Sequence, residues 1–292
     1  MMTNPKKNSD IRFAFFGTSH IAVFVLEALQ GAELIPQLIL TQEPKPQGRG
    51  LEAQPTAVEV WGRSHDVPVA YETSALENSS PGGGWDVAVV VDYGNLLPKN
   101  ILDIPRRGFL NVHPSLLPSL RGASPIRSAI LKNEKTTGVS VMLVSEGMDE
   151  GPIVAQKKIE IDPWPIKNAE LEKILLHAGG ALLAQTLPQW VAGEIDAHEQ
   201  NHDIATYSER IKKEDGLLDL RADGYANLLK IRAYEGWPGT YTFFERQGKK
   251  IRVGIIDAHM DASKLVIDTV KPEGKKEMPY ADFLRSGAKI VS

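Results

Sequence analysis

Residues 12–17 read RFAFFG, an apolar run that stops at a glycine and is followed by Thr18 and Ser19. Apolar side chains then recur at helical spacing over residues 21–29, so this stretch predicts a strand, a tight turn and a helix. Thr18 or Ser19 is the expected N-cap, because a hydroxyl there can accept a backbone N–H of the first helical turn. A strand that runs directly into a helix is the unit from which open α/β sheets are built.

More strand and helix patterns alternate after this unit. Residues 86–91 read DVAVVV, and a continuous β-branched run of this kind suits a parallel sheet that is covered on both faces. The same reasoning predicts further strands at residues 34–40, 109–113, 138–143 and 153–161, and helices near residues 56–64, 125–133 and 169–190. We therefore expect an α/β domain with a Rossmann-like, parallel-rich sheet.

The pattern changes after Gly193. Residues 193–207 are mostly polar and aperiodic, which is typical of a linker. Beyond them, short strand-like runs are separated by turn residues, at 239–244, 250–256 and 264–269. The sequence therefore predicts an α/β domain over residues 1–192, a linker at 193–207 and a small β-rich domain over 208–292.

Composition excludes several kinds of protein. The 292 residues include no cysteine, so disulfides, thiolate metal sites, a cysteine nucleophile and iron–sulfur clusters are excluded. No run approaches the ~18 apolar residues of a membrane span. No apolar segment follows the basic pair near the start, so we expect no secretory signal and a cytoplasmic location.

The net charge of −4 conceals a difference between the two parts of the chain. From Thr206 onward there are 16 basic and 13 acidic residues, a net of +3, whereas residues 1–205 carry −7. A mildly basic tail on an acidic body indicates a polyanionic partner. Random scatter of surface charge is the alternative that this count leaves open.

Three polar residues form a candidate catalytic set. Asn111 and His113 are two apart in a predicted strand, so their side chains share one face, at the strand end where α/β sheets bind ligands. Asp149 lies in a second turn, between Gly147 and Gly151. An amide can hold an oxyanion, an imidazole can move a proton and a carboxylate can orient the imidazole. In the alternative interpretation these side chains cap turns or fill a polar pocket.

Short motifs around these residues resemble the folate-dependent formyltransferase family. The central block contains Asn111-x-His113, SLLP at 115–118, Arg121-Gly122 and Asp149-x-Gly151. Outside it, similar motifs are FGT at 16–18, YGNLLP at 93–98, ATY at 205–207 and GWPG at 236–239. The resemblance covers nearly the whole chain, and the central block is highly specific.

The resemblance implies a Rossmann-like formyltransferase domain followed by an OB-like β-barrel that helps to bind tRNA. The implied reaction transfers the formyl group of 10-formyltetrahydrofolate to the α-amine of methionine on initiator tRNA, without a metal. We expect the enzyme to be a monomer. Asn111 would hold the formyl oxygen, His113 would relay a proton and Asp149 would keep His113 competent. The resemblance places the folate contacts at Ser115, Leu116, Leu117, Pro118, Leu96 and Leu97.

Three departures from the family pattern concern ligand binding. Asp92 stands where relatives carry a small apolar residue, and it would need a partner if it were buried. Leu51 and Glu52 stand where a lysine pair usually follows, which leaves Arg49 as the main expected tRNA contact of that loop. The C-terminal domain is short between residues 258 and 271, so we expect a barrel that lacks a strand pair.

Other functions deserve comparison with this one. A nucleotide-amino-sugar N-formyltransferase resembles the same central block and is the alternative enzyme. A catalytically inactive tRNA- or folate-binding module is disfavoured, because all three candidate catalytic residues are present. Residues 198–202 read HEQNH, which fits the zinc-protease pattern, but the segment is polar and falls in the predicted linker.

Overall fold

The computed structural model describes residues 8–47 and 52–290. The chain forms two compact units. Unit 1 consists of Met1–Arg121, Gly138–Ile159 and Lys173–Thr206, and unit 2 consists of Gly122–Thr137, Glu160–Glu172 and Tyr207–Ser292. Unit 2 thus includes two segments from within the first 192 residues. The domain boundaries expected from the sequence stay a prediction.

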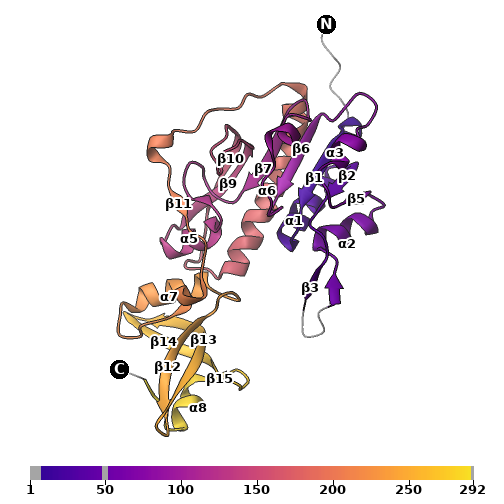
Figure 1. The fold of residues 1–292 in the computed structure, drawn as a ribbon. Helices are drawn as coiled ribbons and strands as arrows, with labels where there is room; N and C mark the ends of the chain where they lie inside the picture. The colour runs from indigo at the N-terminus through magenta and orange to yellow at the C-terminus, as the bar shows by residue number, and fades with distance from the viewer. Residues whose placement is uncertain (1–7, 48–51, 291–292) are drawn as a thin grey trace. The chain divides into compact units, whose positions relative to one another are not determined.

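Unit 1 is built on a seven-stranded sheet of order β10-β9-β7-β6-β1-β2-β5 (Figure 1). The strands are β1 (Phe13–Gly17), β2 (Leu38–Leu40), β5 (Val69–Ala70), β6 (Val87–Val91), β7 (Phe109–His113), β9 (Thr136–Leu143) and β10 (Ile153–Glu160). The pairs β1–β2, β1–β6, β6–β7 and β2–β5 are parallel, and β7–β9 is antiparallel. The Rossmann-like, parallel-rich sheet expected from the sequence is confirmed.

Helices cover both faces of this sheet. They are α1 (His20–Gly31), α2 (Ala57–Ser64), α3 (Ala75–Asn78), α4 (Lys99–Leu102) and α6 (Asn168–Ala192). Phe13 and Phe15 pack with buried residues of α1, α2 and α6, whereas Phe16 packs with buried residues of α3 and α4. This alternation along β1 is what the side-chain period of a strand requires. Ser19 is the N-cap of α1, as one of the two expected residues.

A glycine allows α6 to lie close to α1. A Cβ atom added at Gly180 would lie 2.7 Å from the Cβ of Ala28 and 3.4 Å from the carbonyl oxygen of Phe24. The first distance is shorter than two carbon atoms can tolerate, so a larger residue would push the helices apart. The glycine pair inside α6 is therefore a packing feature rather than a helix end.

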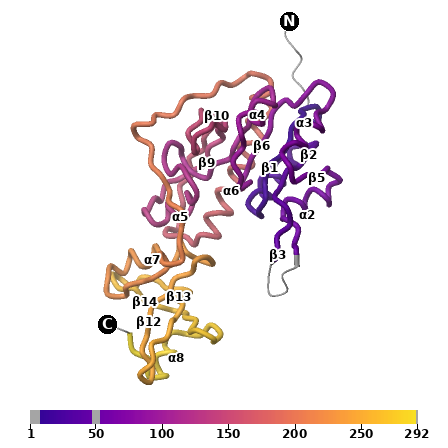
Figure 2. The backbone as a smooth tube through the Cα atoms, viewed as in Figure 1, coloured from indigo at the N-terminus to yellow at the C-terminus, as the bar shows by residue number. Residues whose placement is uncertain are grey.

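Unit 2 contains a five-stranded sheet of order β15-β14-β13-β12-β16. Its strands are β12 (Thr240–Arg246), β13 (Lys249–Asp261), β14 (Lys264–Pro272), β15 (Met278–Pro279) and β16 (Lys289–Ile290), all paired antiparallel. Strands β12, β13 and β14 lie side by side (Figure 2). The segment expected to be short, residues 258–271, comprises the end of β13, the turn at 262–263 and most of β14. The C-terminal antiparallel sheet is confirmed.

Helices also belong to unit 2, and the C-terminal ones were not predicted from the sequence. They are α5 (Pro125–Leu131), α7 (Gly224–Ala233) and α8 (Tyr280–Arg285). Leu228 of α7 and Phe283 of α8 pack against Phe244, Val253 and Val270 of the sheet.

The remaining short strands are β3 (Lys45–Gln47), β4 (Glu52–Gln54), β8 (Arg121–Gly122) and β11 (Tyr207–Ser208). Within the described residues, no helix combines the length and apolarity needed to cross a bilayer.

Candidate active site

A pocket of about 740 Å³ opens in unit 1 beside β6, β7 and β9. Its walls come from the loop that follows β6, from Asn111 and Met142 on the strands, and from the loop that follows β9. Among the residues predicted from the sequence, four line this pocket: Asn111, Asp149, Leu96 and Leu97. Sites at a sheet edge of this kind are where open α/β folds bind ligands.

The turns after β1 and β2 hold the loop that follows β6. The carbonyl oxygen of Tyr93 accepts hydrogen bonds from Thr18 Oγ1 and from Gln42 Nε2, each at 2.9 Å. The ring of Tyr93 is buried edge-on against Phe16, and burial raises the pKa of its hydroxyl. The start of this pocket wall is therefore held in place by hydrogen bonds from the turns after β1 and β2.

Asp92 lines the same pocket and is exposed. Its backbone lies in the left-handed region at φ 45°, which Asp tolerates better than most residues. The hydroxyl of Ser19 donates a hydrogen bond to its carboxylate. The departure at Asp92 thus places a carboxylate at the pocket surface with a partner, and no buried unpaired charge results.

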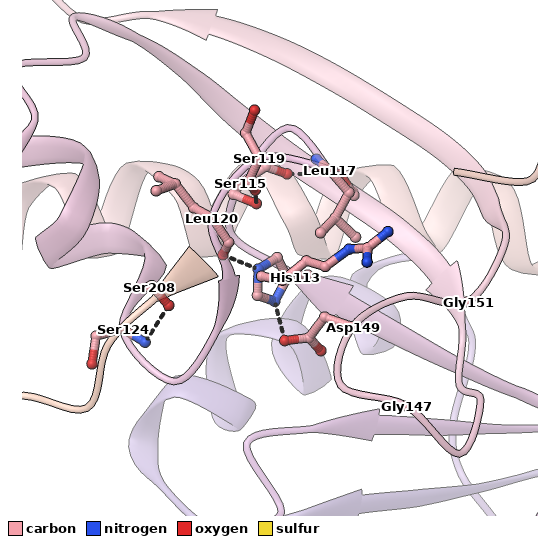
Figure 3. Close-up of polar contacts among 12 residues, drawn as sticks. His113, Ser115, Leu117, Ser119, Leu120, Ser124, Gly147, Asp149, Gly151 and Ser208 are labelled. Carbon is pink, nitrogen blue, oxygen red and sulfur yellow. Dashed lines mark hydrogen bonds and ion pairs between the residues drawn. The ribbon is translucent and has the colours of Figure 1, made fainter. Parts of the chain in front are cut away.

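His113 is buried, with 4% of its surface exposed, and both ring nitrogens face a partner (Figure 3). Nε2 lies 3.0 Å from the carbonyl oxygen of Leu120, and Nδ1 lies 3.6 Å from Oδ2 of Asp149. A carbonyl oxygen only accepts, so Nε2 carries the proton of this hydrogen bond. In the neutral ring Nδ1 is consequently the free base, and it is directed at the carboxylate.

The residues that supply these two partners adopt unusual backbone conformations. Leu120 lies at φ 59° and Asp149 at φ 51°. Left-handed backbone in a non-glycine residue costs roughly 1–3 kcal/mol and persists where the surroundings enforce it. At Gly151, near the end of the Asp149 loop, a Cβ atom would lie 2.0 Å from the Leu143 carbonyl oxygen. The conformation that directs Asp149 toward His113 therefore depends on glycine at this position.

The structure places residues 115–118 outside the pocket lining. Ser115 Oγ donates to the carbonyl oxygen of Ser119 at 2.6 Å, and the backbone N–H of Leu117 donates to Ser140 Oγ at 3.1 Å. These bonds fold the loop that connects His113 to Leu120. The folate contacts predicted for Ser115, Leu116, Leu117 and Pro118 stay a prediction, and Arg49 lies outside the described residues.

The HEQNH segment does not form the helix that a zinc-protease site requires. His198 makes an isolated bridge to Ile153, and His202 begins a short 3₁₀ turn, His202–Ile204. Nδ1 of His202 lies 3.3 Å from two guanidinium nitrogens of Arg121. The segment therefore belongs to the surroundings of His113 and lacks the helix that would place both histidines on one face.

Several residues of the site had no signal in the sequence. Leu120 acts through its carbonyl group, so its side-chain type gives no indication of a role. Met142 and residues 144–148 line the pocket beside Asp149. The two glycines of that turn indicated close backbone approach, but they did not indicate that the loop would fold over a pocket.

An amide, an imidazole and a carboxylate gather here at the edge of a Rossmann-like sheet, beside a pocket of cofactor size. This fold and set of side chains suit an acyl-transfer enzyme. The sequence profile of the formyl transferase family matches residues 11–187. The chain belongs to the formyl transferase family.

Named relatives show which members of this family the chain resembles. The methionyl-tRNA formyltransferase of Chloroflexus aurantiacus is 38% identical over 248 residues, which cover 82% of this chain and 79% of the relative. That of Thermus thermophilus is 36% identical over 302 residues, covering 94% and 96%. The solved N-formyltransferase from Helicobacter canadensis, in complex with folinic acid and dTDP-3-aminofucose, shares the fold. Its TM-score is 0.63 at 17% identity, with 88% of this chain and 98% of that one covered.

Proposed function

We propose that this enzyme transfers the formyl group of 10-formyltetrahydrofolate to the α-amine of methionine on initiator methionyl-tRNA. The observation that carries the proposal is the contact of His113 with Asp149 beside a pocket that Asn111 also lines. The names of relatives that match most of the chain give the acceptor. The reaction uses a folate co-substrate and no metal, and we assign it to a cytoplasmic monomer.

Asn111 is suited to hold the formyl oxygen. Its side-chain amide makes no hydrogen bond with another residue in the described ranges 8–47 and 52–290, and it lines the pocket. When the amine nitrogen attacks the formyl carbon, that oxygen gains negative charge. An N–H donor directed at the oxygen stabilises this charge, and such a donor is worth on the order of 10²–10³ in rate.

His113 and Asp149 are suited to move the proton. With Nε2 bound to the Leu120 carbonyl, Nδ1 and the Asp149 carboxylate together accept one proton between them. The attacking amine loses a proton to this pair as its bond to the formyl carbon forms. The pair returns a proton to the folate nitrogen as the old carbon–nitrogen bond breaks, so charge and protons balance.

The pocket walls suit a planar, partly apolar ligand. Leu97, Met142 and Val144 supply apolar surface, and the loop of residues 145–148 completes the lining. We place the pterin here, with Leu96 and Leu97 as one wall. The observed contacts of residues 115–118 support a role in holding His113, and direct folate contact by them remains our expectation from the family resemblance.

Unit 2 offers a basic surface for the tRNA. The guanidinium of Arg252 lies 3.8 Å from the ring centroid of Tyr241, and the ammonium of Lys250 lies 4.2 Å from that of Phe243. Both cations are exposed on β13, and Lys275 lies on the same unit beside a hollow of about 260 Å³. Exposed cations of this kind neutralise backbone phosphates. We assign this surface and Arg49 to tRNA binding.

An acceptor comparison tests the proposal. Purified enzyme is given 10-formyltetrahydrofolate with either methionine-charged initiator tRNA or a dTDP-linked amino sugar, and formylated product is measured. We expect product with the charged tRNA and none with the sugar. Uncharged initiator tRNA is the matched control, because it presents the same phosphates without the amine. Transfer to the sugar alone would refute the proposed acceptor.

A further inference from the structure

We infer that Gln200, together with Arg121, is a positioning residue that fixes both partners of His113 at once. The inference rests on the proposed function for the substrates used to test it, and on the contacts of unit 1 for everything else. Gln200 belongs to the HEQNH segment, which the pocket lining does not include. Its effect would reach the reaction through Asp149 and Leu120.

The amide of Gln200 is buried, with 4% of the residue exposed, and both its ends are bonded. Nε2 donates to the carbonyl oxygens of Asp149 at 2.9 Å and Gly151 at 2.7 Å. Oε1 accepts from Nε of Arg121 at 3.0 Å and from Nη2 at 2.7 Å. An amide has two donors and two acceptor sites, so this set uses its full capacity.

Arg121 connects Gln200 to the other partner of His113. Arg121 is 1% exposed, and its own N–H belongs to the peptide unit whose carbonyl is that of Leu120. That N–H donates to the carbonyl oxygen of Thr206 at 2.9 Å, and the N–H of Leu120 donates to Thr206 Oγ1 at 2.9 Å. Residues 200–206 therefore hold the peptide that accepts the proton of Nε2.

These contacts close a ring around the imidazole. Leu120 fixes Nε2, Asp149 faces Nδ1, and Gln200 joins the residue after Leu120 to the backbone of Asp149. Asp149 holds a left-handed backbone that its neighbours must enforce. Gln200 supplies two of the bonds that enforce it. A carboxylate displaced by about 1 Å can reduce turnover by about 10²-fold.

Only an amide satisfies both sides of this arrangement. The guanidinium of Arg121 requires an acceptor, and the two carbonyl oxygens of the Asp149 loop require donors. Gln200→Glu keeps the acceptor for Arg121 but has no donor for the carbonyls when it is ionised. This variant therefore separates the support of the Asp149 loop from the support of Arg121.

The experiment measures turnover and the state of the His113 ring in the full-length enzyme. For Gln200→Glu and Gln200→Ala we expect kcat to fall by about 10- to 100-fold, with KM for folate and acceptor within about 3-fold of wild type. We also expect the ¹⁵N signals of the His113 ring to shift in both variants. In wild type, those signals should show a protonated Nε2 that donates to the Leu120 carbonyl.

Gln37→Ala is the matched control in the same unit. Gln37 also bridges backbone groups, since it accepts from the N–H of Phe13 at 2.8 Å and donates to the carbonyl of Ile35 at 3.0 Å. We expect this variant to lower thermal stability but to keep wild-type kcat. A similar loss of kcat in Gln37→Ala would show that the effect at Gln200 is merely structural.

Several results would overturn the inference. One is a kcat for Gln200→Glu within 3-fold of wild type, and another is a lower kcat with unchanged His113 ring signals. A wild-type ring with no proton on Nε2 would also refute it, even if neither Gln200 variant folds. Failure of the proposed function is distinguishable, because wild-type enzyme would then fail to formylate charged tRNA while the ring signals would still report on Gln200.

Discussion

The two units use polar side chains in opposite ways. In unit 1, His113, Arg121 and Gln200 are almost completely buried. Nε2 of His113 and both ends of the Gln200 amide have defined hydrogen-bond partners. In unit 2, Lys250 and Arg252 are exposed and rest on aromatic rings. Unit 1 holds a few polar atoms in defined positions, whereas unit 2 presents positively charged side chains to solvent.

This difference corresponds to two physical demands. Proton transfer requires groups within hydrogen-bond reach, and burial keeps them from moving. Binding of an extended polyanion requires several cations whose separate contributions are small and screened by salt. Substitutions in unit 1 should therefore affect turnover steeply and individually. Those in unit 2 should affect binding gradually and additively.

The largest expected effect comes from removing the imidazole. His113→Ala should lower kcat by on the order of 10²–10⁴, the range for loss of a general acid or base. The measurement is steady-state formyl transfer with charged initiator tRNA at saturating folate. His177→Ala, which removes an exposed imidazole of α6, is the control and should retain wild-type kcat. Unchanged turnover in His113→Ala would remove this residue from the mechanism.

A moderate effect is expected at the cationic surface of unit 2. Replacing Lys250 and Arg252 by alanine should raise KM for the tRNA by about 3- to 10-fold and lower the slope of its salt dependence by about 1 per lost phosphate contact. KM for folate should not change. Arg221→Ala removes another exposed cation of the unit and serves as the control. If tRNA kinetics were insensitive to the double variant, this surface would have no part in binding.

The smallest effect concerns an ion-pair cluster in unit 2. Asp257 contacts Lys167 at 3.0 Å and Arg232 at 2.7 Å. Burial acts to raise the pKa of Asp257, but the two cations outweigh burial and lower it below its ordinary value. A carboxyl group with a lowered pKa in the folded state stabilises the fold at neutral pH, and this contribution is lost as pH falls through the folded-state pKa.

Asp257→Asn should therefore cost about 0.5–1 kcal/mol at pH 7, a modest amount because the side chain is about one-third exposed and its charge is screened. The difference in unfolding free energy between this variant and wild type should shrink as the pH falls below 3.8, the ordinary pKa of an aspartate. Denaturant unfolding at several pH values measures it, with Asp261→Asn as the control. A difference that does not depend on pH would mean that packing, not charge, is responsible.

The sequence allowed the central strands to be predicted because their apolar runs are local. Residues 86–91 became β6, and the expected cap Ser19 binds the first turn of α1. The shared strand of Asn111 and His113 was equally local. Helix α7 was missed because only a weak apolar stripe marks it among the charged residues. The bond from Gln200 to Arg121 joins positions 79 residues apart, which no local pattern can indicate.

The close contact at Gly151 also bears on how such enzymes can diversify. The backbone N–H of Leu143 donates to the carbonyl of Pro152 at 2.9 Å, so the two ends of the intervening loop are tied together. Within those ends, residues 144–148 contribute pocket surface, while the glycine and the neighbouring carboxylate are constrained. Substitutions at residues 144–148 can therefore alter ligand preference during evolution while the catalytic geometry is kept. Selection is free to act on the two properties separately.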